Sequence, residues 1–212
     1  MRWLTIALLG VVSAGVSAQG GPTSAPPQIR LNVVNACAPN DLEQKQIAAA
    51  LARIPERPAF SKDFEIARGH STDKEGASDW IRLRREFMPD TLFSSVQFML
   101  TISGDSIEES LVLHAKANQP GEPLQISLEN EVTQGRAAEV LRSDTPPNRI
   151  RLERFGKPSL VLARCSQIDQ KAYESLFRTA AERFARYRAA LDVRGTVAPE
   201  LARFQSAPAK PR

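Results

Sequence analysis

The sequence predicts an α+β protein, in which an antiparallel meander sheet of about six to seven strands packs against a long C-terminal helix, with an additional N-terminal helix. Two patterns predict this class. Between residues 63 and 163, short segments that alternate apolar with polar residues follow one another through brief connections, which is typical of neighbouring antiparallel strands with one solvated face. Residues 169–192 then carry apolar side chains at helical spacing, so one face of this helix can cover the sheet.

The chain is expected to divide into four regions. Residues 1–18 form a predicted signal peptide, and residues 19–28, rich in Gly, Pro and Ser, form a flexible leader. Residues 29–192 form a single α+β domain, and residues 193–212 are expected to be a frayed C-terminal tail. The length of 212 residues suits one domain, and 42% hydrophobic with 25% charged residues is the composition of a soluble globular protein.

The first residues predict export. Arg2 supplies a positive charge, Trp3–Val12 is an uncharged apolar stretch, and small residues precede a cleavage point near Ala18. This apolar stretch is shorter than the about 20 residues that a membrane-spanning helix needs. We therefore expect a bacterial protein that is periplasmic or secreted after cleavage, with no membrane span in the mature chain. An N-terminal anchor that is never cut is the alternative interpretation.

The domain is expected to begin with a strand and a helix. Ile29–Val34 alternates apolar with polar residues, which favours a short strand. Asn40 then opens a helix, Glu43 completes a capping box three residues later, and Pro55 ends the helix. The residues predicted on the apolar face of this helix are Leu42, Ile47, Leu51 and Ile54.

A change from helical spacing to alternation marks the strands. Phe64 and Ile66 belong to the first strand, and Gly69–Ser78 is expected to be a polar loop. Residues 132–142 favour a short helix, and Gly156-Lys157 is predicted to be a two-residue hairpin turn with Gly first. The further strands are predicted at residues 79–87, 96–102, 111–116, 124–129, 149–153 and 160–165.

The last predicted helix has an apolar stripe that allows two interpretations. The stripe can be ordinary core that covers the sheet, or it can line an apolar cavity between a curved sheet and the helix. Core packing is the interpretation that we favour. The residues of the stripe are Tyr173, Leu176, Phe177, Ala180, Phe184, Tyr187 and Leu191.

Cys37 and Cys165 are the two cysteines of the chain. In an oxidising compartment an isolated pair favours a disulfide. The alternative is a reactive thiolate at a helix N-terminus. Because no CxxC spacing and no partner base accompany either cysteine, we expect the structural bridge.

Motifs for catalysis, metal binding and cofactor binding are missing from the sequence, so we predict no catalytic residue, no metal ligand and no cofactor. His70 and His114 are the two histidines, and neither has a partner at metal-ligand spacing. His70 stands in His-Ser-Thr-Asp, where a hydroxyl and a carboxylate could lie beside the imidazole. We interpret His70 as a solvated loop residue and His114 as a surface residue or a cross-strand partner on the more polar face of a strand.

Four arginines at outward-facing strand positions form a candidate ligand-binding set, namely Arg82, Arg84, Arg149 and Arg151. If their two strands lie close together, they make a basic patch for phosphate, carboxylate or acidic glycan. The other interpretation is a solvated sheet face with cross-strand Arg–Glu pairs. Acidic residues alternate with these arginines, which favours the solvated face.

These observations favour a non-enzymatic binding or envelope-associated module, whose partner is a protein or a small molecule of the cell envelope. One alternative is a carrier of a small apolar or anionic ligand in a sheet–helix cavity, with Arg82, Arg84 or Arg151 at its mouth. A second alternative is a hydrolase that uses a histidine. A net charge of +4, without a concentrated basic stripe, argues against a nucleic-acid partner.

Overall fold

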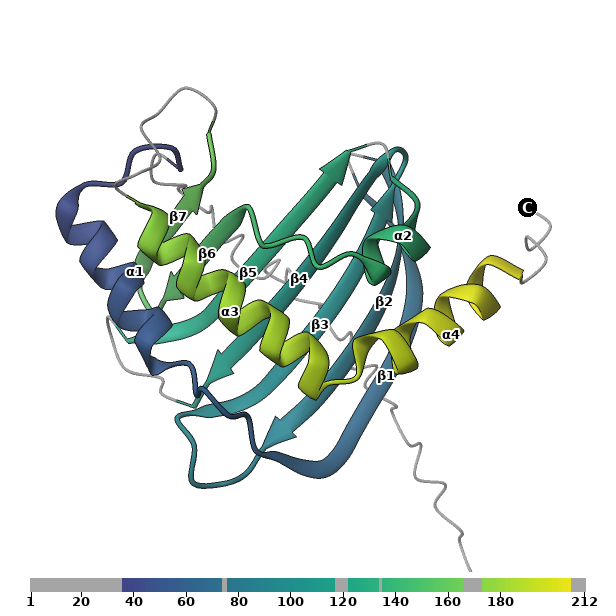
Figure 1. Ribbon diagram of the computed structural model, residues 1–212, viewed down its shortest axis with the longest axis horizontal. Coiled ribbons are helices and arrows are strands. Elements are labelled where there is room, and N and C mark those ends of the chain that lie inside the picture. Colours follow the sequence, from purple (N-terminus) through teal and green to yellow (C-terminus); the bar gives the residue numbers. More distant parts are fainter. Residues whose placement is uncertain (1–35, 74–75, 117–121, 134, 166–172, 207–212) are drawn as a thin grey trace, which may run out of the picture. The chain divides into compact units, whose positions relative to one another are not determined.

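A seven-stranded antiparallel sheet is the framework of the computed structural model, which describes residues 36–73, 76–116, 122–133, 135–165 and 173–206. Each strand pairs with its neighbours in sequence, so the sheet is an open meander (Figure 1). This confirms the predicted fold class. The strands are β1 (Phe60–Asp73), β2 (Gly76–Phe87), β3 (Phe93–Ser103), β4 (Ser106–Ala115), β5 (Pro123–Thr133), β6 (Arg149–Arg154) and β7 (Lys157–Ala163).

Four helices pack on one face of this sheet (Figure 1). They are α1 (Asp41–Arg53), α2 (Ala137–Arg142), α3 (Glu174–Ala190) and α4 (Val193–Ser206). Tyr187 of α3 is fully buried, and its ring packs edge-on against Phe60 and Phe87 at centroid distances of 6.3 and 6.1 Å. The predicted stripe of the C-terminal helix is therefore core at this position.

The two faces of the sheet differ because side chains alternate along each strand. The face under the helices, here called the helix face, is apolar and buried. Its buried apolar residues are Ile81, Leu83, Val96, Phe98, Leu100, Ile107, Leu111, Leu113, Ile126, Leu128, Ile150, Leu152, Leu160 and Leu162. The opposite face, here called the open face, is covered by none of the described helices and is mostly polar. Arg82, Arg84, Arg149 and Arg151 all lie on it.

The start of α1 confirms the predicted capping box. The side chain of Asn40 accepts a hydrogen bond from the backbone of Glu43, and the Glu43 carboxylate accepts one from the backbone of Asn40. Ile47, Leu51 and Ile54 are buried as predicted. Leu42, in the first turn of the helix, is 64% exposed instead of joining them.

The segment predicted as a polar loop, Gly69–Ser78, is largely a β-hairpin. Gly69 pairs with Trp80 and Ser71 with Ser78, so β1 and β2 extend beyond the helices. A Cβ at Gly69 would collide with the ring of Trp80, so the glycine lets this indole lie across the neighbouring strand. The polar composition concealed the strands because neither face of the hairpin is deeply buried here.

The turn between β6 and β7 differs from the prediction by one residue. Arg154 pairs with Lys157, so Phe155 and Gly156 are the two turn residues. Gly156 has a φ of 65°, a conformation that glycine adopts without strain. The glycine therefore stands second in the turn.

Residues 193–206 form α4, which corrects the expected frayed tail over this range. Val193, Val197 and Leu201 recur at helical spacing and are buried against the rest of the core. Pro199 lies inside this helix, and the packing of the apolar residues outweighs its cost.

Several predictions lie outside the described residues. These are the signal peptide, the leader, the strand at Ile29–Val34 and the beginning of the C-terminal helix at residues 169–172. No helix among the described residues is long and apolar enough to cross a membrane.

Candidate functional site

The four predicted arginines fall into two separate pairs on the open face. Arg82 and Arg84 stand on β2, whereas Arg149 and Arg151 stand on β6, with three strands between them. Four inter-strand steps of ~4.8 Å put the two pairs about 19 Å apart. The four side chains therefore do not form one patch, and they face away from the helices, so none stands at the mouth of a cavity between sheet and helix.

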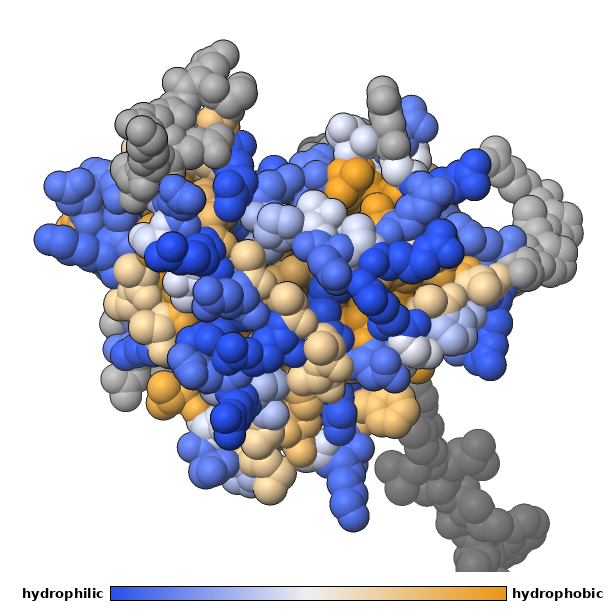
Figure 2. All heavy atoms as spheres, viewed as in Figure 1, coloured by the Kyte–Doolittle hydropathy of each residue, from blue (hydrophilic) through white to orange (hydrophobic). Residues whose placement is uncertain are grey.

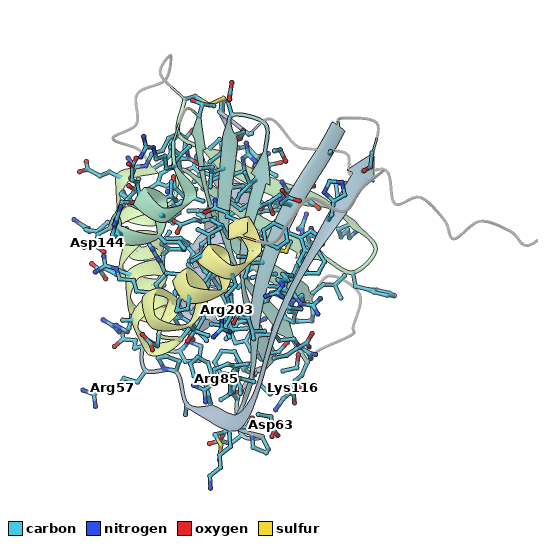
Figure 3. All side chains as sticks on the ribbon, turned by 90° about the vertical axis from the view of Figure 1, so that its right-hand side faces the viewer. Arg57, Asp63, Arg85, Lys116, Asp144 and Arg203 are labelled. Carbon is cyan, nitrogen blue, oxygen red and sulfur yellow. A yellow bond between two sulfur atoms is a disulfide. The ribbon has the colours of Figure 1, made fainter. Side chains whose placement is uncertain are left out.

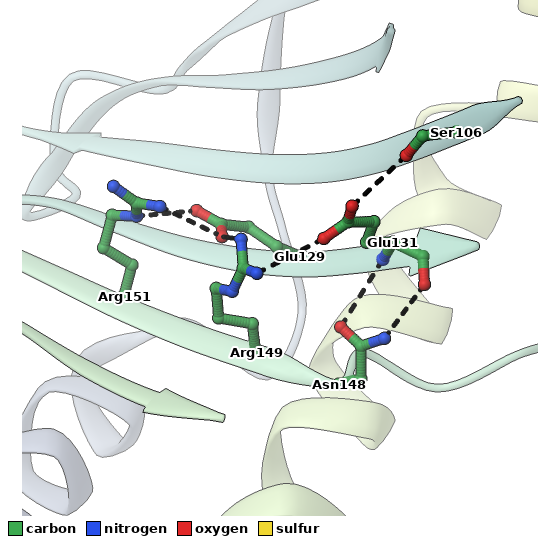
Figure 4. A network of polar contacts seen from close by, with 6 residues as sticks. All are labelled: Ser106, Glu129, Glu131, Asn148, Arg149 and Arg151. Carbon is green, nitrogen blue, oxygen red and sulfur yellow. Dashed lines mark hydrogen bonds and ion pairs between the residues drawn. The ribbon is translucent and has the colours of Figure 1, made fainter. Parts of the chain in front are cut away.

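Each of these arginines is ion-paired with glutamate. Arg82 pairs with Glu65 across β1 and β2, and Arg84 pairs with Glu86 at 3.0 Å. On β6, Arg151 Nε lies 2.9 Å from Glu129, which also accepts from Arg149 at 3.4 Å (Figure 4). The open face is thus an alternating network of opposite charges, in which each of these four guanidinium groups has a carboxylate partner.

One carboxylate of this network has a raised pKa. Burial raises the pKa of Glu108 on β4, and the nearby charges of Glu129 and Glu131 add to the effect. His114, farther along β4, has a lowered pKa because of burial, with a contribution from Arg84. These two shifts follow from burial and from neighbouring charges on the sheet.

His70 joins a carboxylate to a hydroxyl. Its Nδ1 lies 2.8 Å from Asp79 Oδ1, and its Nε2 lies 3.4 Å from Thr72 Oγ1. The order hydroxyl, imidazole, carboxylate is that of a hydrolase triad. The imidazole side chain is however 59% exposed, at the hairpin of β1 and β2, where water screens the charges that a catalytic base must control.

The disulfide between Cys37 and Cys165 is formed, as predicted, with a Cα–Cα distance of 5.7 Å. It links the segment before α1 to the end of β7. Ala163 also donates a backbone hydrogen bond to Ala36 beside it. The bridge therefore attaches the N-terminal part of the helix layer to the last strand.

A pocket of about 450 Å³ lies beside α3, where this helix meets α4 and the connection after α2. We call it the α3 pocket. Small side chains of α3 leave the space open, and Phe184 and Arg188 are buried residues of its lining. The apolar residues that line it are Pro146, Ala181, Phe184, Ala185, Ala189 and Val193.

Arg188 connects the α3 pocket to a buried carboxylate on the helix face. Its guanidinium donates to the carbonyl oxygens of Leu141 and Ser143 at 2.7 and 2.8 Å, and lies 3.2 Å from Glu109 Oε1. Glu109 is fully buried on β4 opposite Asn130 of β5. Burial raises the pKa of Glu109 to about 7, although Arg188 opposes the shift.

The charged groups at the mouth of the pocket belong to the outer side of the helix layer. Asp144 is 86% exposed and accepts from Arg194 at 2.7 Å, and Figure 3 shows it at the outer edge of this layer. From the side of Figure 1, hydrophilic residues cover most of the helices and apolar residues show between them (Figure 2). The pocket therefore combines an apolar interior with a charged entrance.

Sequence reasoning missed both Arg188 and Glu109. Glu109 interrupts the apolar positions of β4, and Arg188 interrupts the buried side of α3. Each of these charged residues stands at a position that the apolar periodicity assigns to the core. This was the available signal of a buried ion pair, because a charged residue is buried only with a partner.

Among the described residues, no cluster of three or more His, Cys, Asp or Glu side chains is arranged to hold a metal ion. The chain matches no family model, no curated protein and no solved structure.

Proposed function

We propose that the protein is an exported, non-enzymatic binding module and that the α3 pocket is its ligand site. The observation that carries the proposal is the pocket itself. Its volume of about 450 Å³ lies within the range of small-molecule sites, and its apolar walls with a few charged groups are the usual composition of such sites.

Export is supported by two independent features. The N-terminal residues have the composition of a signal peptide, and the chain holds its two cysteines as a disulfide, which persists in oxidising compartments. A periplasmic or secreted location is accordingly part of the proposal.

The helix that forms the pocket wall is held at several points, which favours a pocket formed before the ligand arrives. The Tyr187 hydroxyl donates to the carbonyl of Pro55 at 3.3 Å, and Arg183 pairs with Glu56 at 3.2 Å. Arg188 adds its two bonds to the carbonyls around the end of α2. A site fixed in this way loses little conformational entropy when it binds.

The test is native mass spectrometry of residues 19–212, purified from a periplasm, together with a titration of a naphthalene-based fluorescent probe. Ala185→Trp fills the pocket, and Ala190→Trp places the same side chain at an exposed position of α3 that does not line it. We expect a bound mass or probe in the wild type and in Ala190→Trp, and none in Ala185→Trp. Equal binding by both variants, or no binding by the wild type, would reject the site.

The exposed Thr72–His70–Asp79 arrangement supports hydrolysis as a second candidate function. Hydrolysis of p-nitrophenyl acetate by the wild type, by His70→Gln and by His114→Gln tests it. Turnover that disappears only in His70→Gln would establish this candidate. A rate equal to that of free imidazole at the same concentration would remove it.

A further inference from the structure

We infer that the α3 pocket selects a small organic anion, whose apolar body fills the pocket and whose acidic group binds Arg188 and Arg194. This inference rests on the proposed function, because it names the chemical class of ligand for the same site.

The carboxylates around the pocket are engaged or lie at its outer end. Asp144 pairs with Arg194. Asp192 caps α4, since its Oδ1 accepts from the backbone of Gly195 at 3.2 Å, and a Cβ at Gly195 would collide with this carboxylate. Glu182 is exposed and precedes Arg188 by six residues, or about 9 Å along a helix. Arg188 inside the pocket and Arg194 at its mouth are therefore the groups left to bind an anion.

Both arginines keep N–H groups for a ligand. Arg188 reaches its partners among the described residues through its two terminal nitrogens, which leaves Nε without one. Arg194 uses only Nη2, for the carbonyl of Arg142 and for Asp144, both at 2.7 Å. Guanidinium donors of this kind bind carboxylate, sulfonate or phosphate through charge-assisted hydrogen bonds.

Glu109 determines how much positive charge Arg188 presents to the pocket. Both of its carboxylate oxygens and Nδ2 of Asn130 are buried without a hydrogen bond among the described residues. The groups that face Glu109 are Arg188 from α3 and Asn130 from β5, while its neighbour on β3 is Leu100. With Glu109 protonated, the charge of Arg188 has no buried counter-ion, so an anion in the pocket can take that place.

Calorimetric titration with three ligands that share one apolar body but differ in charge tests the preference for an anion. The ligands are naphthalene-2-carboxylate, its neutral carboxamide and 2-naphthylmethylammonium. We expect the carboxylate to bind about tenfold more tightly than the carboxamide, and the ammonium to bind most weakly. The carboxylate is also expected to bind several-fold more tightly at about pH 6 than at about pH 8, because burial raises the pKa of Glu109 to about 7.

Substitutions test whether the preference for the carboxylate ligand comes from the α3 pocket. Arg194→Gln, at a side chain that is 56% exposed, should reduce the affinity for the carboxylate several-fold, toward that for the carboxamide. Arg178→Gln, an exposed arginine of α3 that does not line the pocket, should change nothing. Glu109→Gln should remove the pH dependence and keep the preference for the anion.

The outcomes distinguish this inference from the proposed function. Equal affinity for all three ligands, abolished by Ala185→Trp, would overturn the anion preference and leave the pocket as a binding site. A preference for the ammonium would overturn the inference in the same way. Binding that Ala185→Trp does not affect, or no binding of any of the three, would overturn both.

Discussion

Arginine–glutamate pairs occur on both faces of the sheet, but in opposite surroundings. On the helix face, Glu109 is 0% and Arg188 8% exposed, and the pair lies among apolar side chains. On the open face, Arg82 and Glu65 are 34% and 49% exposed. Water screens the charges of the second pair and not those of the first. Breaking the buried pair is therefore expected to cost more stability than breaking the exposed one.

The difference shows where a functional site is to be sought in this protein. The open face has the greater number of charges, but each arginine identified in the sequence already pairs with a glutamate of that face. On the helix face, the pair of Glu109 and Arg188 is buried, is attached to the carbonyls of Leu141 and Ser143, and borders the α3 pocket. Burial, more than the number of charged residues, therefore identifies the candidate site.

The largest effect is expected at the covalent link between the helix layer and the sheet. Replacing Cys37 and Cys165 together by Ser removes a bridge that spans 128 residues, and the chain-entropy model gives about 4–5 kcal/mol for such a loop. Urea unfolding measures this loss. The wild type unfolded in reducing agent is the control and should match the variant. A loss below about 1 kcal/mol would show that non-covalent contacts alone hold the two layers together.

The second-largest effect is expected at the buried pair on the helix face, and it should exceed the effect of breaking an exposed pair on the open face. Arg188→Met leaves Glu109 without its counter-ion in the core, and breaking a buried pair costs about 3–5 kcal/mol. Arg82→Met on the open face is the matched control and should cost less than about 1 kcal/mol. Both values come from urea unfolding at about pH 8, where Glu109 is mostly ionised. Equal losses for the two variants would contradict the distinction between the faces.

Glu109 should also give the stability of the protein a pH dependence. Its pKa is raised from 4.5 to about 7 in the folded state, so the folded protein binds more protons than the unfolded chain between these values. The resulting stabilisation is present below about pH 4.5 and is lost as the pH rises to about 7, by about 3 kcal/mol.

Glu109→Gln isolates this contribution, since the amide does not titrate. The difference in unfolding free energy between wild type and variant, measured in urea from about pH 5 to about pH 8, should fall as the pH rises. A difference that stays constant, or that grows with pH, would show that the carboxylate is ionised throughout.

The smallest effect is expected within the open face. A double-mutant cycle of Arg82→Gln and Glu65→Gln should give a coupling of about 0.2–1 kcal/mol, decreasing in high salt, because both side chains are solvated. Thermal unfolding at low and high ionic strength measures it. A salt-independent coupling above about 2 kcal/mol would mean that this pair behaves like a buried one.

Local patterns in the sequence determined much of the fold. Alternation placed Arg82 and Ile81 on opposite faces of β2, because successive side chains of a strand point in opposite directions. Asn40 and Glu43 fixed the start of α1, since a capping box satisfies backbone groups within one turn. The two cysteines could be paired because each had only the other as a partner.

Tertiary structure alone decided which distant residues meet. Arg84 and Arg151 were predicted to face outward, and the observed strand order puts β3, β4 and β5 between them, but which glutamate each arginine pairs with was decided by the register and the side-chain packing. Residues 193–206 form a helix because their apolar side chains pack against the core, which outweighs the effect of Pro199. The hairpin around Gly69 forms because its two strands pair, despite their polar composition. Glu109, Asn130 and Arg188 come from two strands and a helix. Their contact, and the pocket beside it, depend on how these elements pack, and no spacing along the chain encodes that arrangement.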